Sequence, residues 1–103
     1  MKLFVTQLIF LREGQRESFE EYEDTVIPLL EKYRGQLMYR IKCHEDYVQC
    51  RLNEMPHEIH IISFPNQAAL KNYLEDPKRQ ELANLREGIV RQDLSILGRL
   101  RST

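Results

Sequence analysis

The segment PHEIHIISF, residues 56–64, places His57, Glu58 and His60 close together. Imidazole and carboxylate side chains can bind metal ions or transfer protons near neutral pH. On a helix an i, i+3 pair shares one face, whereas on a strand an odd separation sends the two side chains to opposite faces. The β-branched residues of this segment favour a strand. We therefore expect His57 and His60 to point to opposite faces, with Glu58 on the face of His60.

The cysteine and histidine spacing does not predict a metal site. The segment lacks the second histidine of the zinc-protease motif HExxH. Six residues separate Cys43 from Cys50, and six separate Cys50 from His57, which does not match a zinc knuckle. We expect no metal ion and no cofactor. The start of the sequence resembles a first strand more than a signal peptide, so we expect reduced thiols and a cytoplasmic protein.

Five residues are candidates for a functional site. We consider His60 and His57 as catalytic groups that move a proton, although a structural role is the alternative for each. Arg40 lies among apolar neighbours and could anchor an anionic ligand, or extend its stem to a sheet edge. Tyr39 and Tyr22 could line a binding pocket or fill the core. The candidate site is therefore His60 and His57 for catalysis, with Arg40, Tyr39 and Tyr22 for substrate binding.

Apolar periodicity predicts the elements that would position these residues. Strands are expected at residues 2–10, 36–43, 57–64 and 93–100, with a short extension possible at 47–52. Helical segments are expected at residues 15–35, 67–75 and 77–88. The acidic run of the first helix is expected to face solvent. Pro28 should kink or split that helix near residues 24–26.

The composition describes an ordinary folded domain. The chain has 103 residues, 42% of them hydrophobic and 30% charged, with a formal net charge of -1. A length of this order supports one domain, here residues 1–103. The charge balance argues against nucleic-acid binding, and no apolar run is long enough to cross a membrane.

The order of elements, βαββαβ, is the ferredoxin-like α+β arrangement. It has a four-stranded antiparallel sheet with its helices on one face. The first and third predicted strands are apolar on both sides, so the uncovered face would expose a large apolar surface. We expect two copies to pair through these sheet faces as a homodimer.

Two stretches resemble a known family, and they run from Phe19 to Arg40 and from Glu58 to Glu87. The resemblance is to a small bacterial family of unknown function in the dimeric α/β-barrel superfamily, distantly similar to antibiotic-biosynthesis monooxygenases. The matching positions are Tyr22, Val26, Pro28, Leu29, Lys32, Tyr33, Gly35, Arg40, Phe64, Pro65, Ala69, Tyr73, Asp76, Pro77, Leu82 and Arg86. Arg34 departs from the pattern, since the family has a glycine there. The resemblance implies a dimeric barrel and transfers no catalytic residues.

Three functions remain open from the sequence. The first is a cofactor-independent monooxygenase or isomerase that acts on a small, partly apolar molecule between the sheet and the helices. The second is a binding or sensing module that holds a small molecule without converting it. The third is a structural interaction protein. The sequence does not identify the ligand or decide whether the protein is an enzyme.

Overall fold

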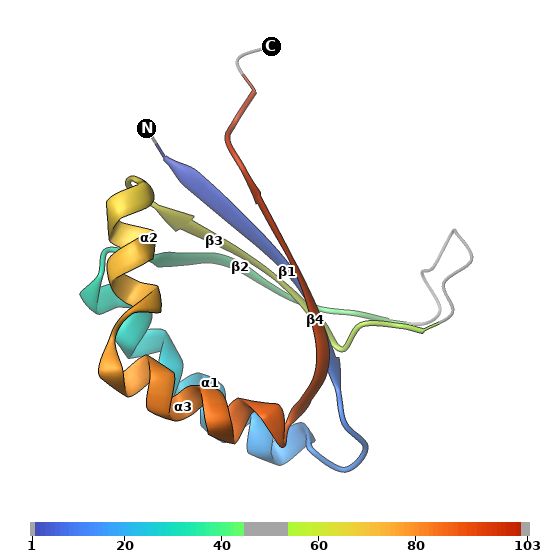
Figure 1. The fold of residues 1–103 in the computed structure, drawn as a ribbon. Coiled ribbons are helices and arrows are strands. Elements are labelled where there is room, and N and C mark those ends of the chain that lie inside the picture. The colour runs from blue at the N-terminus through green and yellow to red at the C-terminus, as the bar shows by residue number, and fades with distance from the viewer. Residues whose placement is uncertain (1, 45–53, 102–103) are drawn as a thin grey trace.

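The computed structural model describes residues 2–44 and 54–101, which form a layer of helices on one sheet (Figure 1). The strands are β1 (Leu3–Leu11), β2 (Gln36–Lys42), β3 (Glu58–Phe64) and β4 (Val90–Gly98). The helices are α1 (Arg16–Lys32), α2 (Gln67–Leu74) and α3 (Pro77–Glu87). All strand pairs are antiparallel, in the order β2-β3-β1-β4. The predicted α+β, ferredoxin-like arrangement is confirmed.

Side-chain caps explain where the two later helices begin. The Asn66 side chain accepts a hydrogen bond of 2.8 Å from the backbone N–H three residues on, which starts α2. Asp76 does the same for α3 by accepting from the backbone N–H groups of Lys78 and Arg79. Each cap satisfies donors that the first helical turn leaves unpaired. Both helix starts agree with the prediction from the sequence.

The first helix differs from its prediction in two respects. α1 runs unbroken from Arg16 to Lys32 with Pro28 inside it, so the helix does not split near residues 24–26, and the alternative of a kink there stays a prediction. The proline removes one backbone donor, while the apolar stripe of the helix packs against the sheet on both sides of it. The acidic first half does not lie wholly in solvent, because Glu23 is buried.

The core lies between the helices and the sheet. Its buried residues come from β1, β3, β4, α1, α3 and the turn between α3 and β4, namely Val5, Ile9, Phe19, Tyr22, Val26, Leu30, Phe64, Leu82, Ile89 and Val90. At the turn between α1 and β2, a Cβ atom on Gly35 would lie 2.5 Å from Leu30 Cδ1 and 2.9 Å from Phe64 Cε1. The side chains of α1 and β3 therefore leave no room for a side chain at this position.

The opposite face of the sheet carries no helix, since α1, α2 and α3 all lie on one side (Figure 1). The pairing registers place a set of apolar side chains on this outer face: Phe4, Leu8, Tyr39, Ile41, Ile59, Ile61, Leu94 and Ile96. Tyr39 is 59% exposed and Ile96 62% exposed. The apolar uncovered face predicted from the sequence is thus present in the chain.

The strand bounds shift slightly from those predicted. β3 begins at Glu58, so that His57 precedes the strand, and β4 begins at Val90 instead of residue 93. The extension expected at 47–52, and Cys50 with it, lie outside the described residues. Among the helices of the described ranges, none combines the length and apolarity that crossing a membrane requires.

Candidate functional site

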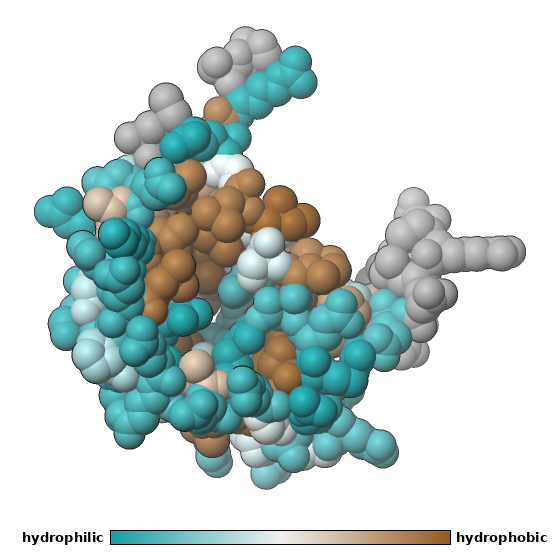
Figure 2. All heavy atoms as spheres, viewed as in Figure 1, coloured by the Kyte–Doolittle hydropathy of each residue, from teal (hydrophilic) through white to brown (hydrophobic). Residues whose placement is uncertain are grey.

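A cavity of about 280 Å³ lies between the sheet and the helices. Figure 2 shows it as a hollow, lined largely by apolar side chains. Its deep wall is formed by buried residues, among them Val5, Tyr22, Glu23, Val26, Leu30, His60 and Phe64. Its mouth is formed by exposed residues of α2 and β4, namely Leu74, Ser95 and Leu97. A space of this size and lining is suited to a small, partly apolar molecule.

Glu23 places a carboxyl group in the deep wall of this cavity, and only 5% of the residue is exposed. Within the described residues, its carboxyl forms no hydrogen bond and no ion pair. No fully buried side-chain oxygen or nitrogen in that part of the chain lacks a partner, so the Glu23 oxygens must reach the open space of the cavity. Burial raises the pKa of Glu23 to about 7, although Arg40 and Arg86 nearby oppose the shift.

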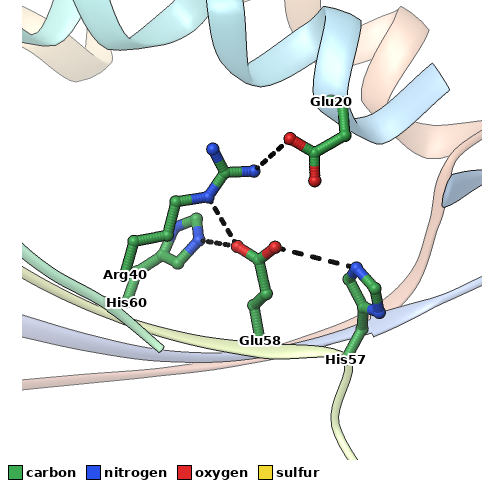
Figure 3. A network of polar contacts seen from close by, with 5 residues as sticks. All are labelled: Glu20, Arg40, His57, Glu58 and His60. Carbon is green, nitrogen blue, oxygen red and sulfur yellow. Dashed lines mark hydrogen bonds and ion pairs between the residues drawn. The ribbon is translucent and has the colours of Figure 1, made fainter. Parts of the chain in front are cut away.

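His60 is a second buried group of the cavity, and it belongs to a chain of polar contacts drawn in Figure 3. Its Nε2 lies 2.8 Å from Oε1 of Glu58. Arg40 Nε donates to the same oxygen at 2.7 Å, and a terminal nitrogen of Arg40 donates to Glu20 at 3.1 Å. The network therefore joins β2, β3 and α1 beside the cavity.

The charges within this network define the state of His60. Burial alone would raise the pKa of Glu58, but hydrogen bonds from Arg40 and His60 hold it below the usual range. An ionised carboxylate can only accept, so His60 Nε2 must carry the proton and donate it. Burial in turn lowers the pKa of His60, which keeps the ring neutral. The Nδ1 atom of His60 then holds a free lone pair that can accept a proton.

Tyr22 adds a hydroxyl group to the same wall. It is buried on α1 directly before Glu23, and burial raises the pKa of its hydroxyl to about 12. The hydroxyl therefore stays protonated at neutral pH and can donate a hydrogen bond to a ligand oxygen. Of the residues predicted from the sequence, Tyr22 and His60 both line the cavity.

The prediction that His57 and His60 point to opposite faces is wrong. The Phe19 ring on α1 contacts both imidazoles, with centroid separations of 5.6 Å to His57 and 6.2 Å to His60. Figure 3 shows the carboxylate of Glu58 between the two rings. His57 lies outside β3, where the alternation of side chains no longer applies. Its ring faces the helices but does not line the cavity.

The remaining two predicted residues also lie outside the cavity lining. Arg40 is paired with two carboxylates, Glu58 and Glu20, so that its charge is already compensated. Tyr39 lies on the outer face of the sheet, opposite Ile61 of β3. The structure thus brings Tyr22 and His60 together in one space and separates them from Tyr39.

One group in the described part of the chain has ligand atoms close enough to share a metal ion. It consists of Glu20, His57 and Glu58, whose ligand atoms lie within 4.8 Å of one another. Arg40 pairs with both of its carboxylates, which reduces the negative charge available to a cation. Cys43, of the cysteines considered above, is a free thiol. The expectation of no metal ion stays a prediction.

Glu23 is the residue of the site that the sequence reasoning missed, whereas Glu58 was placed on the face of His60 but not named as a candidate. Glu23 stands four residues after Phe19 and three before Val26, which is the spacing of the buried stripe on α1. Glu58 stands two residues before His60 and therefore shares its strand face. The periodicity of α1 would have found Glu23 if it had been applied to polar as well as apolar residues, while the alternation of β3 correctly placed Glu58 beside His60.

A family model of unknown function matches most of the chain. The model of the DUF1330 family, a domain of unknown function, matches residues 10–100. Among curated proteins, none matches the chain.

Several solved structures share the fold. A protein of unknown function from Rhodopseudomonas palustris is 17% identical, with a TM-score of 0.85 over 99% of this chain and 84% of its own. A dimeric ferredoxin-like protein of unknown function from Jannaschia sp. CCS1 is 18% identical, with a TM-score of 0.73 over 97% of this chain and 100% of its own. SnoaB, a cofactor-independent oxygenase from Streptomyces nogalater, is 14% identical, with a TM-score of 0.69 over 99% of this chain and 94% of its own. At these identities the likeness shows the fold alone.

Proposed function

The chain belongs to the DUF1330 family, a domain of unknown function, and from that premise we propose that it is a homodimeric, cofactor-independent enzyme. Its reaction begins when a proton is abstracted from a small, partly apolar molecule in the cavity. The observation that carries the proposal is Glu23, a buried carboxyl without a partner in the described residues, whose pKa of about 7 suits a general base.

Three side chains divide the proposed chemistry. The Glu23 carboxylate takes a proton from an acidic C–H or O–H group of the substrate. The Tyr22 hydroxyl donates a hydrogen bond to the substrate oxygen on which negative charge develops. His60, positioned by Glu58, offers Nδ1 as a second proton acceptor, and Arg40 acts on it only through Glu58.

The proton abstraction leads to either of two products. Return of the proton to another carbon completes an isomerisation. Transfer of electrons from the deprotonated substrate to molecular oxygen begins an oxygenation, which needs no bound cofactor when the carbanion itself is the reductant. SnoaB, named as a cofactor-independent oxygenase, shares this fold and supports the second route.

The homodimer is part of the proposal because of the outer face of the sheet. Its apolar residues, Tyr39, Ile41, Leu94 and Ile96 among them, are exposed in the single chain. A contiguous apolar face of this kind is unusual on a monomer, and a second copy covers it with an identical face. The structural neighbour from Jannaschia sp. CCS1 is described as dimeric. We also propose a cytoplasmic location, as expected from the sequence.

Hydrogen exchange in D₂O tests the proposal without knowledge of the substrate. Small oxo acids, lactones and phenols are incubated with the protein, and ¹H NMR follows deuterium uptake at acidic carbon positions. We expect catalysed exchange whose rate rises with pH and levels off above pH 7, as Glu23 ionises. The E23Q variant should lose at least about 100-fold of that rate. The matched control is E21Q, which removes an exposed carboxyl from the same helix.

Two results would contradict the proposal that the protein is an enzyme with Glu23 as its base. Exchange that is equal in E23Q and wild type would remove Glu23 as the base. Saturable binding without exchange or product would favour the sensing module, in which the cavity holds a metabolite unchanged.

A further inference from the structure

Two arginines from α3, Arg79 and Arg86, line the cavity. Arg86 forms an ion pair with Asp93 of β4, so that its charge is compensated within the protein. This pair also ties α3 to β4 beside the cavity. The charge of Arg86 is therefore already balanced and attracts an anionic ligand less than an unpaired guanidinium would.

Arg79 is in a different environment. Among the described residues, no carboxylate lies within 4.0 Å of its guanidinium group, whereas Arg40, Arg86 and Arg91 all have such partners. The guanidinium instead lies over the Tyr73 ring, 5.3 Å from the centroid. This cation–π contact holds the guanidinium in place. Burial raises the pKa of Tyr73, and a hydrogen bond from Arg79 to the Tyr73 hydroxyl opposes that shift. The guanidinium has further N–H donors, which remain available to a ligand.

Arg79 lies close in the sequence to a residue of the cavity mouth. Arg79 is half-buried in the first turn of α3, just beyond Leu74 at the end of α2, and Leu74 is one of the exposed residues of the mouth. The deep wall beyond it is largely apolar, with Val5, Leu30 and Phe64. A ligand that fills this space meets carbon over most of its surface and one planar cation at its outer end.

The charges around the cavity set the charge of that ligand. Arg86 and Asp93 cancel, which leaves Arg79 as a cavity-lining charge without a carboxylate partner among the described residues, while Glu23 in the same lining is only partly ionised near neutral pH. A single negative charge therefore balances Arg79, whereas a dianion would leave one charge unpaired in a partly buried site. A carboxylate also matches the planar donors of guanidinium in a bidentate pair.

On the basis of the proposed function of this cavity, we propose that its ligand is a monocarboxylate with an apolar body, whose carboxylate pairs with Arg79 at the mouth. The apolar body lies against the deep wall, near Glu23 and Tyr22. Arg79 thus takes the anion-binding role that the sequence suggested for Arg40.

Matched ligand pairs test the inference. Calorimetry or NMR titration compares phenylacetate with phenylacetamide, and hexanoate with hexanamide, while phenyl phosphate serves as the dianionic probe. We expect each carboxylate to bind about 10-fold or more tightly than its amide, because the bond to Arg79 is charge-assisted. We expect phenyl phosphate to bind no better than phenylacetate.

Variants then test whether Arg79 is responsible for the preference for carboxylates over amides. R79Q should bring each carboxylate and its amide to equal affinity. K78Q removes the preceding positive charge, which lies on the same helical turn but outside the cavity lining, and should keep the preference. R79K keeps the positive charge but lacks the planar donors, so it should retain part of the preference for carboxylates over amides. Melting temperatures of all variants check that each one is folded.

Three outcomes overturn the inference. They are equal binding of acids and amides to the wild type, a preference that survives in R79Q, and tighter binding of phenyl phosphate. In each case the proposed function still stands if Glu23-dependent exchange is observed in D₂O. Loss of that exchange together with an intact carboxylate preference would contradict the proposed function instead.

Discussion

At the scale of single residues, the protein buries two carboxyl groups whose surroundings shift their pKa values in opposite directions. Glu23 has no hydrogen-bond partner in the described residues, so burial dominates and raises its pKa to about 7. Glu58 is just as buried, yet Arg40 and His60 donate to it, and its pKa lies below the usual range. The first carboxyl can gain and lose a proton near neutral pH, whereas the second stays charged and orients its neighbours.

The pH dependence of stability should reveal the Glu23 shift. The folded pKa of about 7 lies above the ordinary value of 4.5, so the native state binds this proton more tightly than the unfolded state does. Wild type therefore loses stability as pH rises from about 4.5 to 7. E23Q cannot titrate, and we expect its free energy of unfolding relative to wild type to rise by roughly 2–3 kcal/mol between pH 5 and pH 8.

Urea denaturation at both pH values measures this difference. E21Q, on the exposed side of α1, should follow wild type across the range. An E23Q difference that is the same at pH 5 and pH 8 would show that Glu23 titrates normally.

The stability that depends on Glu58 should change with pH in the opposite direction to that of Glu23. In E58Q, Arg40 and His60 lose a buried charged acceptor, and the free energy of unfolding should fall by roughly 2–4 kcal/mol at pH 7. Because folding lowers the pKa of Glu58, its ionised carboxylate stabilises wild type at pH values above the ordinary carboxyl pKa. This stabilisation is lost as the pH falls through the lowered pKa of the folded state. The gap between wild type and E58Q should therefore narrow in acid, as chemical denaturation at pH 7 and pH 3 can measure.

Glu20 provides the control for this network. Its carboxylate also pairs with Arg40, but its side chain is 55% exposed. An exposed pair is worth little, so E20Q should change stability far less than E58Q. Equal effects of the two variants would contradict the central role of Glu58.

At the scale of elements, the turn from α1 to β2 decides how closely the first helix approaches the sheet. Arg34 adopts a positive φ of 65°, the conformation that favours glycine, and the resembling family has glycine at this position. The next residue, Gly35, donates its N–H to the carbonyl of Leu30 and has no room for a side chain. Both positions therefore favour glycine, but only position 35 has one.

Substitutions at this turn should change stability in opposite directions. R34G should stabilise the protein by roughly 0.5–1 kcal/mol, because it relieves the left-handed backbone of an exposed residue. G35A should destabilise it by roughly 1–3 kcal/mol, because the added methyl group meets Leu30 and Phe64. Thermal unfolding of both variants measures the effect. A stabilising G35A would mean that the helix can move away from the sheet without loss.

At the scale of the whole molecule, the helices cover one face of the sheet and leave the other face apolar. The proposed dimer hides that face, and the side chain of Ile96, 62% exposed in the single chain, would lie in the interface. We expect light scattering to report about 25 kDa, twice the 12.4 kDa of one chain. I96K should reduce this to the mass of one chain at micromolar concentration, because it places a charge in an apolar contact.

The control for this variant is L85K. Leu85 is an exposed apolar residue of α3, on the other side of the molecule from the outer face of the sheet. The same chemical change there should leave the dimer intact. A wild-type chain that scatters as a single 12.4 kDa particle would contradict the homodimer.

The sequence by itself determined the order of the elements, the helix caps and the apolar outer face. These features depend on local patterns: the period of apolar residues, Asn66 and Asp76 ahead of their helices, and isoleucines on both sides of β3. Such signals act over a few residues, so they can be read along the chain. They led to the correct fold, and to His60 and Tyr22 as residues that line the cavity.

Only the tertiary structure decided which polar residues meet. The sequence predicts Glu23 on a solvated acidic face, Arg40 either at a sheet edge or as an anchor for an anion, and His57 inside the strand. Each property depends on groups far away in the sequence: the sheet that buries Glu23, the carboxylates of α1 and β3 that pair with Arg40, and the strand boundary that places His57 beside Phe19. A local pattern can indicate which face of an element a residue shares, but charge pairing acts through space and depends on which elements the fold brings together.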